Sequence, residues 1–93
     1  MFKEKKVKIV VKTSKCDSYK QGDEIYVDGP MVNMEKTKVP VCLSAMNAIY
    51  RFIYGVRKGL SNEALGFDEL VFQCPDYPET VTFELIPLDD GEE

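Results

Sequence analysis

Histidine is absent from this 93-residue chain, and its three cysteines include no CxxC pair. Without an imidazole, the chain by itself has no serine triad, no Cys–His pair, no zincin motif and no imidazole general base. The six glycines form neither a P-loop nor a dinucleotide-binding fingerprint. We therefore expect no histidine-dependent or nucleotide-dependent catalysis, and a non-enzymatic role is favoured over an enzymatic one.

Long apolar runs are also missing, because no stretch approaches the ~20 residues that a membrane-spanning helix needs. The first eight residues carry four lysines and lack the apolar run of a signal peptide. We expect a protein of the cytoplasm that does not enter the membrane. Cysteines are normally reduced there, and three of them cannot all pair within one chain, so no disulfide scaffold is expected.

What the chain does contain suits one folded domain. A hydrophobic content of 44% in 93 residues predicts a single globular domain over 1–93, with residues 88–93 as a flexible acidic tail. Seven of the twelve basic residues lie within the first twenty positions, although the net charge is −4. Lys8 and Lys12 alternate with Ile9 and Val11, which is typical of a solvated sheet face. Nucleic-acid binding is therefore not expected.

Alternation and helical spacing predict four strands and one long helix. The strands are expected at 7–13, 24–27, 69–73 and 80–85, and the helix at 43–58. In the first strand Val7, Ile9 and Val11 should meet the core, and the last strand alternates in the same way. The resulting prediction is an α+β fold of two layers, with the helix packed on a mostly antiparallel four-stranded sheet in the order ββαββ.

The predicted helix is apolar over more of its circumference than one sheet can cover. A core-facing stripe follows the three-to-four spacing of an amphipathic helix. Its members are Cys42, Met46, Ile49, Ile53, Val56 and Leu60. Outside this stripe lie Tyr50, Phe52 and Tyr54, which are candidates for an interface. Either the loop 31–34 folds over this excess apolar surface, or a second copy of the chain covers it in a homo-oligomer.

The path of the predicted chain brings the three cysteines to one end of the molecule. Cys16 follows the first strand, Cys42 starts the helix, and Cys74 ends the third strand. Three thiolates would suit zinc or an iron–sulfur cluster, with Asp17, Asp76, water or a substrate as the fourth ligand. The helix N-terminus also favours the thiolate of Cys42, which makes it the candidate for a thiol redox or catalytic role. The alternative is that the cysteines only fill core space.

Three groups of short segments resemble a family of small, uncharacterised three-cysteine proteins from anaerobic bacteria and archaea. The groups are Cys16…Gly22-Asp23-Glu24…Val27, then Val41-Cys42-Leu43-Ser44-Ala45…Ile49-Tyr50…Val56-Arg57…Gly59, and finally Cys74-Pro75-Asp76…Val81-Thr82-Phe83-Glu84. The resemblance covers nearly the whole chain and carries the family's cysteines onto positions 16, 42 and 74. It implies an oxygen-poor setting, where oxygen-sensitive thiolates or clusters are tenable, and no established activity. The family's proline after the helix-start cysteine is Leu43 here, and its Gly-rich, Trp-containing segment is replaced by residues 61–66.

Overall fold

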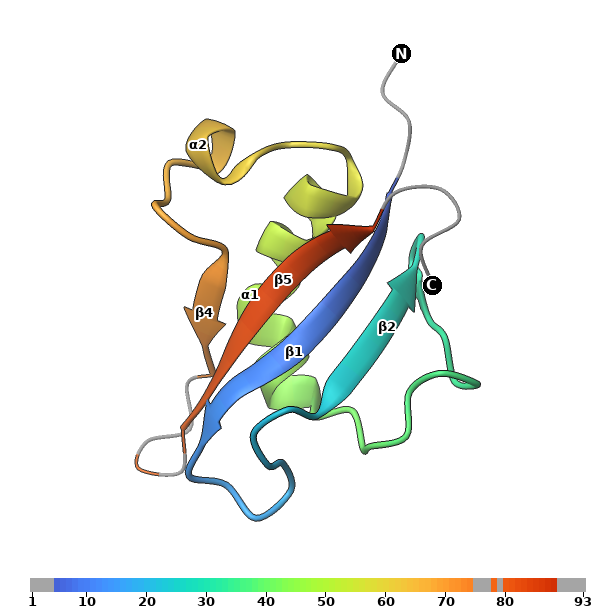
Figure 1. Ribbon diagram of the computed structural model, residues 1–93, viewed down its shortest axis with the longest axis vertical. Helices are drawn as coiled ribbons and strands as arrows, with labels where there is room; N and C mark the ends of the chain where they lie inside the picture. Colours follow the sequence, from blue (N-terminus) through green and yellow to red (C-terminus); the bar gives the residue numbers. More distant parts are fainter. Residues whose placement is uncertain (1–4, 75–77, 79, 89–93) are drawn as a thin grey trace.

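The structure, a computed structural model, describes residues 5–74, 78 and 80–88. One long helix covers one face of an antiparallel sheet, so the fold is α+β in two layers (Figure 1). The elements are β1 (Lys6–Ser14), β2 (Glu24–Asp28), β3 (Met31–Val32), α1 (Leu43–Arg57), α2 (Asn62–Leu65), β4 (Val71–Gln73) and β5 (Val81–Leu88). Within the sheet the strand order is β3-β2-β1-β5-β4.

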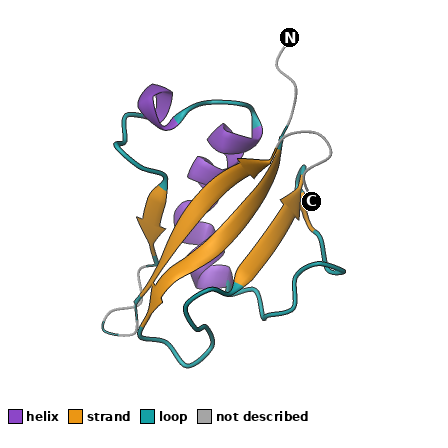
Figure 2. Cartoon of the chain, viewed as in Figure 1, coloured by secondary structure: helices purple, strands orange, loops and turns teal. Residues whose placement is uncertain are grey.

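The described residues form five strands and two helices, so the predicted ββαββ order is wrong in two places (Figure 2). β3 lies in a segment predicted as a loop, and it pairs with β2 through a turn in which Gly29 takes a φ of 57°. Two residues are too few to show an alternating pattern. α2 lies in a predicted turn, where the Ser61 hydroxyl accepts the Ala64 amide at 3.1 Å and Gly66 ends the helix at a φ of 87°.

The central strands β1 and β5 follow the predicted alternation. Val7, Ile9 and Val11 on β1 are buried, and Val81, Phe83, Leu85 and Leu88 are the buried residues of β5. β5 therefore runs through Leu88, where the acidic tail was predicted to begin. The rest of that predicted tail, 89–93, lies outside the described residues.

The open face of the sheet is organised by charge pairs between neighbouring strands. Lys6, Lys8 and Lys12 of β1 each lie within 4 Å of a carboxylate on β2 or β5. These pairs are Lys6–Asp28 at 3.6 Å, Lys8–Glu24 at 3.8 Å and Lys12–Glu84 at 3.5 Å. Pairs this exposed add little stability. The side chains of Lys6, Lys8 and Lys12 are 45%, 27% and 50% exposed, which agrees with the prediction of a solvated sheet face.

The core face of α1 differs in part from the predicted stripe. Ile49, Ile53 and Val56 are buried as predicted, but the first buried position is Ala45. Cys42 and Met46 are only partly buried at the margin of the core, and Leu60 is exposed. No helix in the ranges that the structure describes is long and apolar enough to cross a bilayer.

The inner face of β2 is covered by the loop between β3 and α1, because α1 packs against β1, β4 and β5. Val39 and Val41 of this loop pack against the core, and the buried Thr37 hydroxyl accepts the Tyr26 amide at 3.0 Å. The predicted cover over α1 from residues 31–34 is therefore wrong. Met31 and Met34 are exposed, and this part of the chain extends the sheet beside β2.

Candidate functional site

The three cysteines follow elements that meet at one end of the fold. β1 and β4 both end, and α1 begins, toward the lower end of Figure 1. Cys16 lies two residues after β1, Cys42 is the N-cap of α1, and Cys74 directly follows β4. Cys16 and Cys42 are partly exposed residues, whereas Cys74 is buried.

The described residues at this end do not assemble three metal ligands. Among residues 5–74, 78 and 80–88, no three cysteine or carboxylate side chains are grouped so that they could hold a metal ion. Asp17 belongs to that part of the chain, and Asp76 lies outside it. Cys74 is 4% exposed and packs in the core, where its Sγ accepts the Val81 amide at 3.2 Å. Its placement agrees with a space-filling role.

Tyr19 joins the two partly exposed cysteines, a role that the sequence did not predict. Tyr19 is a buried residue whose hydroxyl donates to the Pro40 carbonyl at 2.7 Å and accepts the Cys42 amide at 2.9 Å. Burial raises the pKa of Tyr19, the hydrogen bond from the Cys42 amide opposes that rise, and the thiolates of Cys42 and Cys16 add to it. The signal in the sequence was one aromatic residue in an otherwise polar loop. Tyr19 thus ties this loop to the start of α1.

Burial predicts the order in which the three thiols react. In native protein, iodoacetamide should modify Cys16 and Cys42 at least roughly tenfold faster than Cys74, because Cys74 becomes accessible only through local opening. The rates should converge in guanidinium chloride at a concentration that unfolds the chain. Peptide mapping by mass spectrometry measures all three rates in one sample. Modification of Cys74 at the rate of Cys42 in the native protein would contradict the core position of Cys74.

A second candidate site lies on the outer side of α1. Tyr50 and Tyr54 are 45% and 47% exposed, and their ring centroids are 6.4 Å apart. Phe52, which was predicted to accompany them, is only partly exposed and faces β4. It stacks on Phe72 with centroids 4.1 Å apart and contacts Phe67 edge to face. A residue two positions away points to a different side of a helix, which is why Phe52 separates from the tyrosines.

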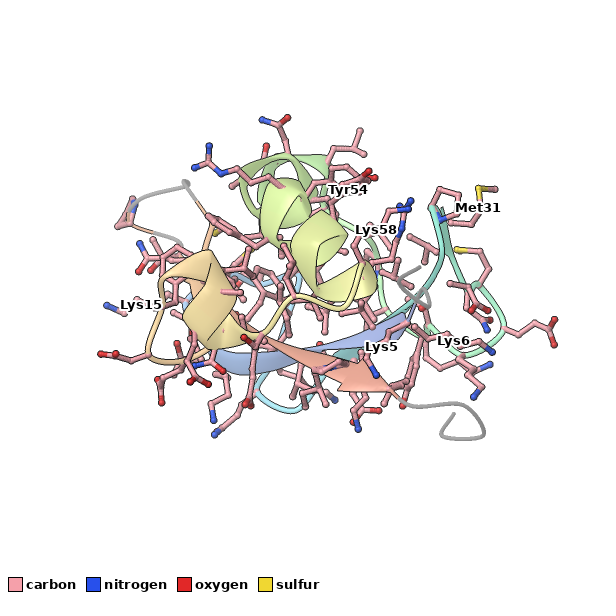
Figure 3. The ribbon with its side chains drawn as sticks, turned by 90° about the horizontal axis from the view of Figure 1, so that it is seen from above. Lys5, Lys6, Lys15, Met31, Tyr54 and Lys58 are labelled. Carbon is pink, nitrogen blue, oxygen red and sulfur yellow. The ribbon has the colours of Figure 1, made fainter. Side chains whose placement is uncertain are left out.

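Two cations hold the exposed tyrosines. Arg57 is only 8% exposed, its Nη1 donates to the Tyr50 hydroxyl at 3.3 Å, and its Cζ lies 4.9 Å from the Tyr54 ring centroid. The Nζ of Lys58 lies 5.4 Å from the same centroid. We call Tyr50, Tyr54, Arg57 and Lys58 the tyrosine–cation face. Figure 3 shows Tyr54 and Lys58 projecting toward the side of the molecule that carries Met31.

The stretch of sequence that contains the tyrosine–cation face carries only positive charge. The 27 residues between Glu35 and Glu63 contain five basic side chains and no acidic one, in a chain whose net charge is −4. They are Lys36, Lys38, Arg51, Arg57 and Lys58. The prediction weighed charge at the two ends of the chain and missed this stretch, although the sequence alone displays it.

A cavity beside β2 is too small for a metabolite. It measures about 10 Å³ and is lined by Lys6, Tyr26, Val27, Asp28, Asn33, Lys36 and Leu88. Such a volume holds about one water molecule, whereas small-molecule sites usually measure about 300–1,000 Å³. This cavity therefore supplies no substrate site, and the exposed face of α1 is the stronger candidate.

Comparisons with protein-family models, with curated proteins and with solved structures each found no match to this chain. The resemblance to the three-cysteine proteins therefore stays a prediction. Any assignment of function has to rest on the chain's own geometry.

Proposed function

We propose that this protein is an interaction module that docks a partner on its tyrosine–cation face. The observation that carries the proposal is the pair of half-exposed tyrosines held in place by Arg57. Tyrosine and arginine are enriched at protein interfaces and among the residues that dominate binding energy. Side chains already held in one arrangement lose less conformational entropy when a partner binds. A preorganised aromatic pair is therefore suited to docking.

Neighbouring surface extends this face along α1. Leu43 is 83% exposed, and its spacing of seven residues from Tyr50 and eleven from Tyr54 puts all three on one side of the helix. The opposite surface of the molecule, the open face of the sheet, is occupied by the Lys–carboxylate pairs of β1. Of these two surfaces, the outer side of α1 offers the larger exposed aromatic area.

Chemical-shift mapping tests the proposal even though the partner is unidentified. The probes are three peptides of about 15 residues that share one leucine pattern and carry Asp, Asn or Lys between the leucines. Each peptide would be added to ¹⁵N-labelled protein. A dilution series of the protein alone would report self-association. We expect at least one of these additions to shift the amide signals of Tyr50, Tyr54 and Lys58. Tyr54→Glu should weaken that interaction at least about tenfold, since hot-spot residues commonly contribute about 2 kcal/mol or more.

The matched control is Gln73→Glu, which adds a carboxylate at an exposed position on β4 and should leave the affinity unchanged. Absence of shifts on α1 with all three peptides, together with a strict monomer at about 0.5 mM, would remove the basis for the docking face. Shifts that survive Tyr54→Glu would do the same.

A thiol site is the second candidate, because Tyr19 contacts the backbone of both partly exposed cysteines: its amide donates to the Cys16 carbonyl at 3.3 Å, and its hydroxyl accepts the Cys42 amide at 2.9 Å. The proposal is that Cys42 acts as a reactive thiol, or that Cys16 and Cys42 bind zinc or an iron–sulfur centre. The metal form would require Cys74, Asp17 or Asp76 to come within reach as a further ligand, because no three such side chains are grouped among the described residues. Metal analysis of untagged protein purified without oxygen tests the metal form. Less than ~0.1 equivalent of transition metal would contradict it, and equal alkylation of Cys16 and Cys42 at neutral pH would contradict a special role for Cys42.

A further inference from the structure

We infer that the tyrosine–cation face receives an acidic segment of a partner protein. The inference rests on the proposed docking function and adds the chemistry of the occupant. It follows from three features of the described residues: the charge of α1, the way its cations are held, and the consequence of placing two copies of α1 against each other.

The first feature is the absence of carboxylates from α1. From Leu43 to Arg57 the helix contains no Asp or Glu, while Arg51, Arg57 and Lys58 carry positive charge on or next to it. A partner that brings carboxylates to this helix therefore meets no like charge from α1 itself. Complementary charge raises the rate of association and selects among partners.

The second feature is that Arg57 and Lys58 contact the tyrosines in different ways. Arg57 is almost fully buried against Tyr50 and Tyr54, so it acts as a positioning residue that holds both rings. Lys58 is more exposed than Arg57 and stands over the Tyr54 ring. Lys58 and the two tyrosine hydroxyls are thus the donors of this face that an incoming carboxylate would engage, in exchange for the contacts that Lys58 makes within the chain. The rings and Leu43 offer apolar contact to the neighbours of that carboxylate. This combination fits a peptide with acidic and apolar side chains.

The third feature argues against a second copy of the chain as the occupant. In a symmetric dimer formed through this face, both copies of α1 would carry positive side chains and no carboxylate, so neither helix would offer an acidic partner to the cations of the other. Like charges that face each other across an interface disfavour association. Nucleic acid is also disfavoured, because Lys6, Lys8 and Lys12 lie on the opposite face of the sheet, where they are paired with carboxylates, and the chain is acidic overall.

Fluorescence anisotropy with the full chain tests the inference. The probes are the fluorescein-labelled Asp–Leu peptide, its Asn–Leu analogue and a single-stranded DNA of about 15 nucleotides, each titrated at about 50 and about 200 mM NaCl. We expect the acidic peptide to bind at least tenfold more tightly than the amide analogue and to weaken at the higher salt concentration. Lys58→Glu should weaken it at least fivefold. The matched control Lys15→Glu reverses the same charge at a distant exposed site and should leave the affinity unchanged (Figure 3).

Each other outcome overturns the inference in a distinguishable way. Equal affinity for the acidic and amide peptides, lost on Tyr54→Glu, would leave the docking face standing and remove the acidic partner. A dimer weakened by Tyr54→Glu would identify a second copy as the occupant. Binding of the DNA alone would identify nucleic acid. Acidic-peptide binding that appears only after Asp89, Asp90, Glu92 and Glu93 are all changed to their amides would identify the chain's own carboxylates as the occupant.

Discussion

Phe83→Ala is expected to lower the free energy of unfolding by about 3–5 kcal/mol, the range measured for large aromatic truncations in protein cores. Phe83 is fully buried on β5, stands opposite Val11 of β1 and Phe72 of β4, and meets the Tyr19 ring edge to face at 5.7 Å. A domain of this length has a total stability of about 5–14 kcal/mol. The variant should therefore lose a large part of its stability. In a urea titration monitored by circular dichroism, its unfolding midpoint should fall to a much lower urea concentration.

Phe67→Ala is the matched control for this substitution. Phe67 is 38% exposed and contacts Phe52 and Phe72 at the margin of the core. Phe67→Ala removes the same side-chain atoms as Phe83→Ala, but from a ring that solvent already reaches. We therefore expect the free energy of unfolding to fall by less than about 2 kcal/mol. A Phe83→Ala variant no less stable than Phe67→Ala would show that the core is not centred on β5.

Tyr19→Phe is the second substitution with a large expected effect, because it removes one oxygen that serves two backbone groups. The Pro40 carbonyl and the Cys42 amide both lose their partner at partly buried hydrogen bonds, and each unpaired polar group costs up to about 1–3 kcal/mol where water cannot replace the partner. The start of α1 should also loosen from the loop that carries Cys16. We expect a lower urea midpoint together with faster alkylation of Cys42, and no change at Cys74.

The control here is Tyr26→Phe, whose hydroxyl donates to the Glu24 carboxylate at 2.7 Å on the open face of the sheet. Solvent can replace that bond, so the loss should stay below about 1 kcal/mol. If Tyr19→Phe is as mild as Tyr26→Phe and leaves the alkylation of Cys42 unchanged, Tyr19 does not tie the loop to α1.

Titration of Tyr19 gives its own dependence of stability on pH. The folded pKa of Tyr19 lies above the ordinary tyrosine value of 10.0, because burial disfavours the phenolate. Between these two pKa values the folded protein binds more protons than the unfolded chain. The contribution of Tyr19 to stability is therefore complete below about pH 10 and falls as the pH rises beyond it. Tyr19→Phe should lose less stability than the wild type between about pH 9.5 and pH 11 in urea titrations.

The sequence predicted the elements whose patterns are long and repetitive. β1 and β5 each alternate over several residues, and Ile49, Ile53 and Val56 recur at helical spacing, so the central strands and the buried side of α1 were predicted correctly. The period of a long pattern can be recognised because each further apolar residue falls on the same face of the strand or helix. β3 and α2 have two and four residues, too few to establish a period, and both were missed.

The side-chain contacts within the candidate sites could not be predicted from sequence periodicity. Tyr19 meets Cys42 from 23 residues away, and Phe52 turns to Phe72 from 20 residues away. Both contacts depend on how loops and strands cross in space, which no local period records. The packing of these loops and strands also places Cys74 in the core, whereas Cys16 and Cys42 lie at the margin of the core.

By itself, the sequence determined the absence of imidazole chemistry, the two-layer class of the fold and the solvated lysines of β1, because composition and period are properties of the chain alone. Only the tertiary structure decided that the cysteines of the described residues form no three-ligand group and that Arg57 is buried beneath two exposed tyrosines. Distances between side chains are set by packing after the strands and the helix have met. For that reason the helix face replaced the cysteines as the leading candidate site.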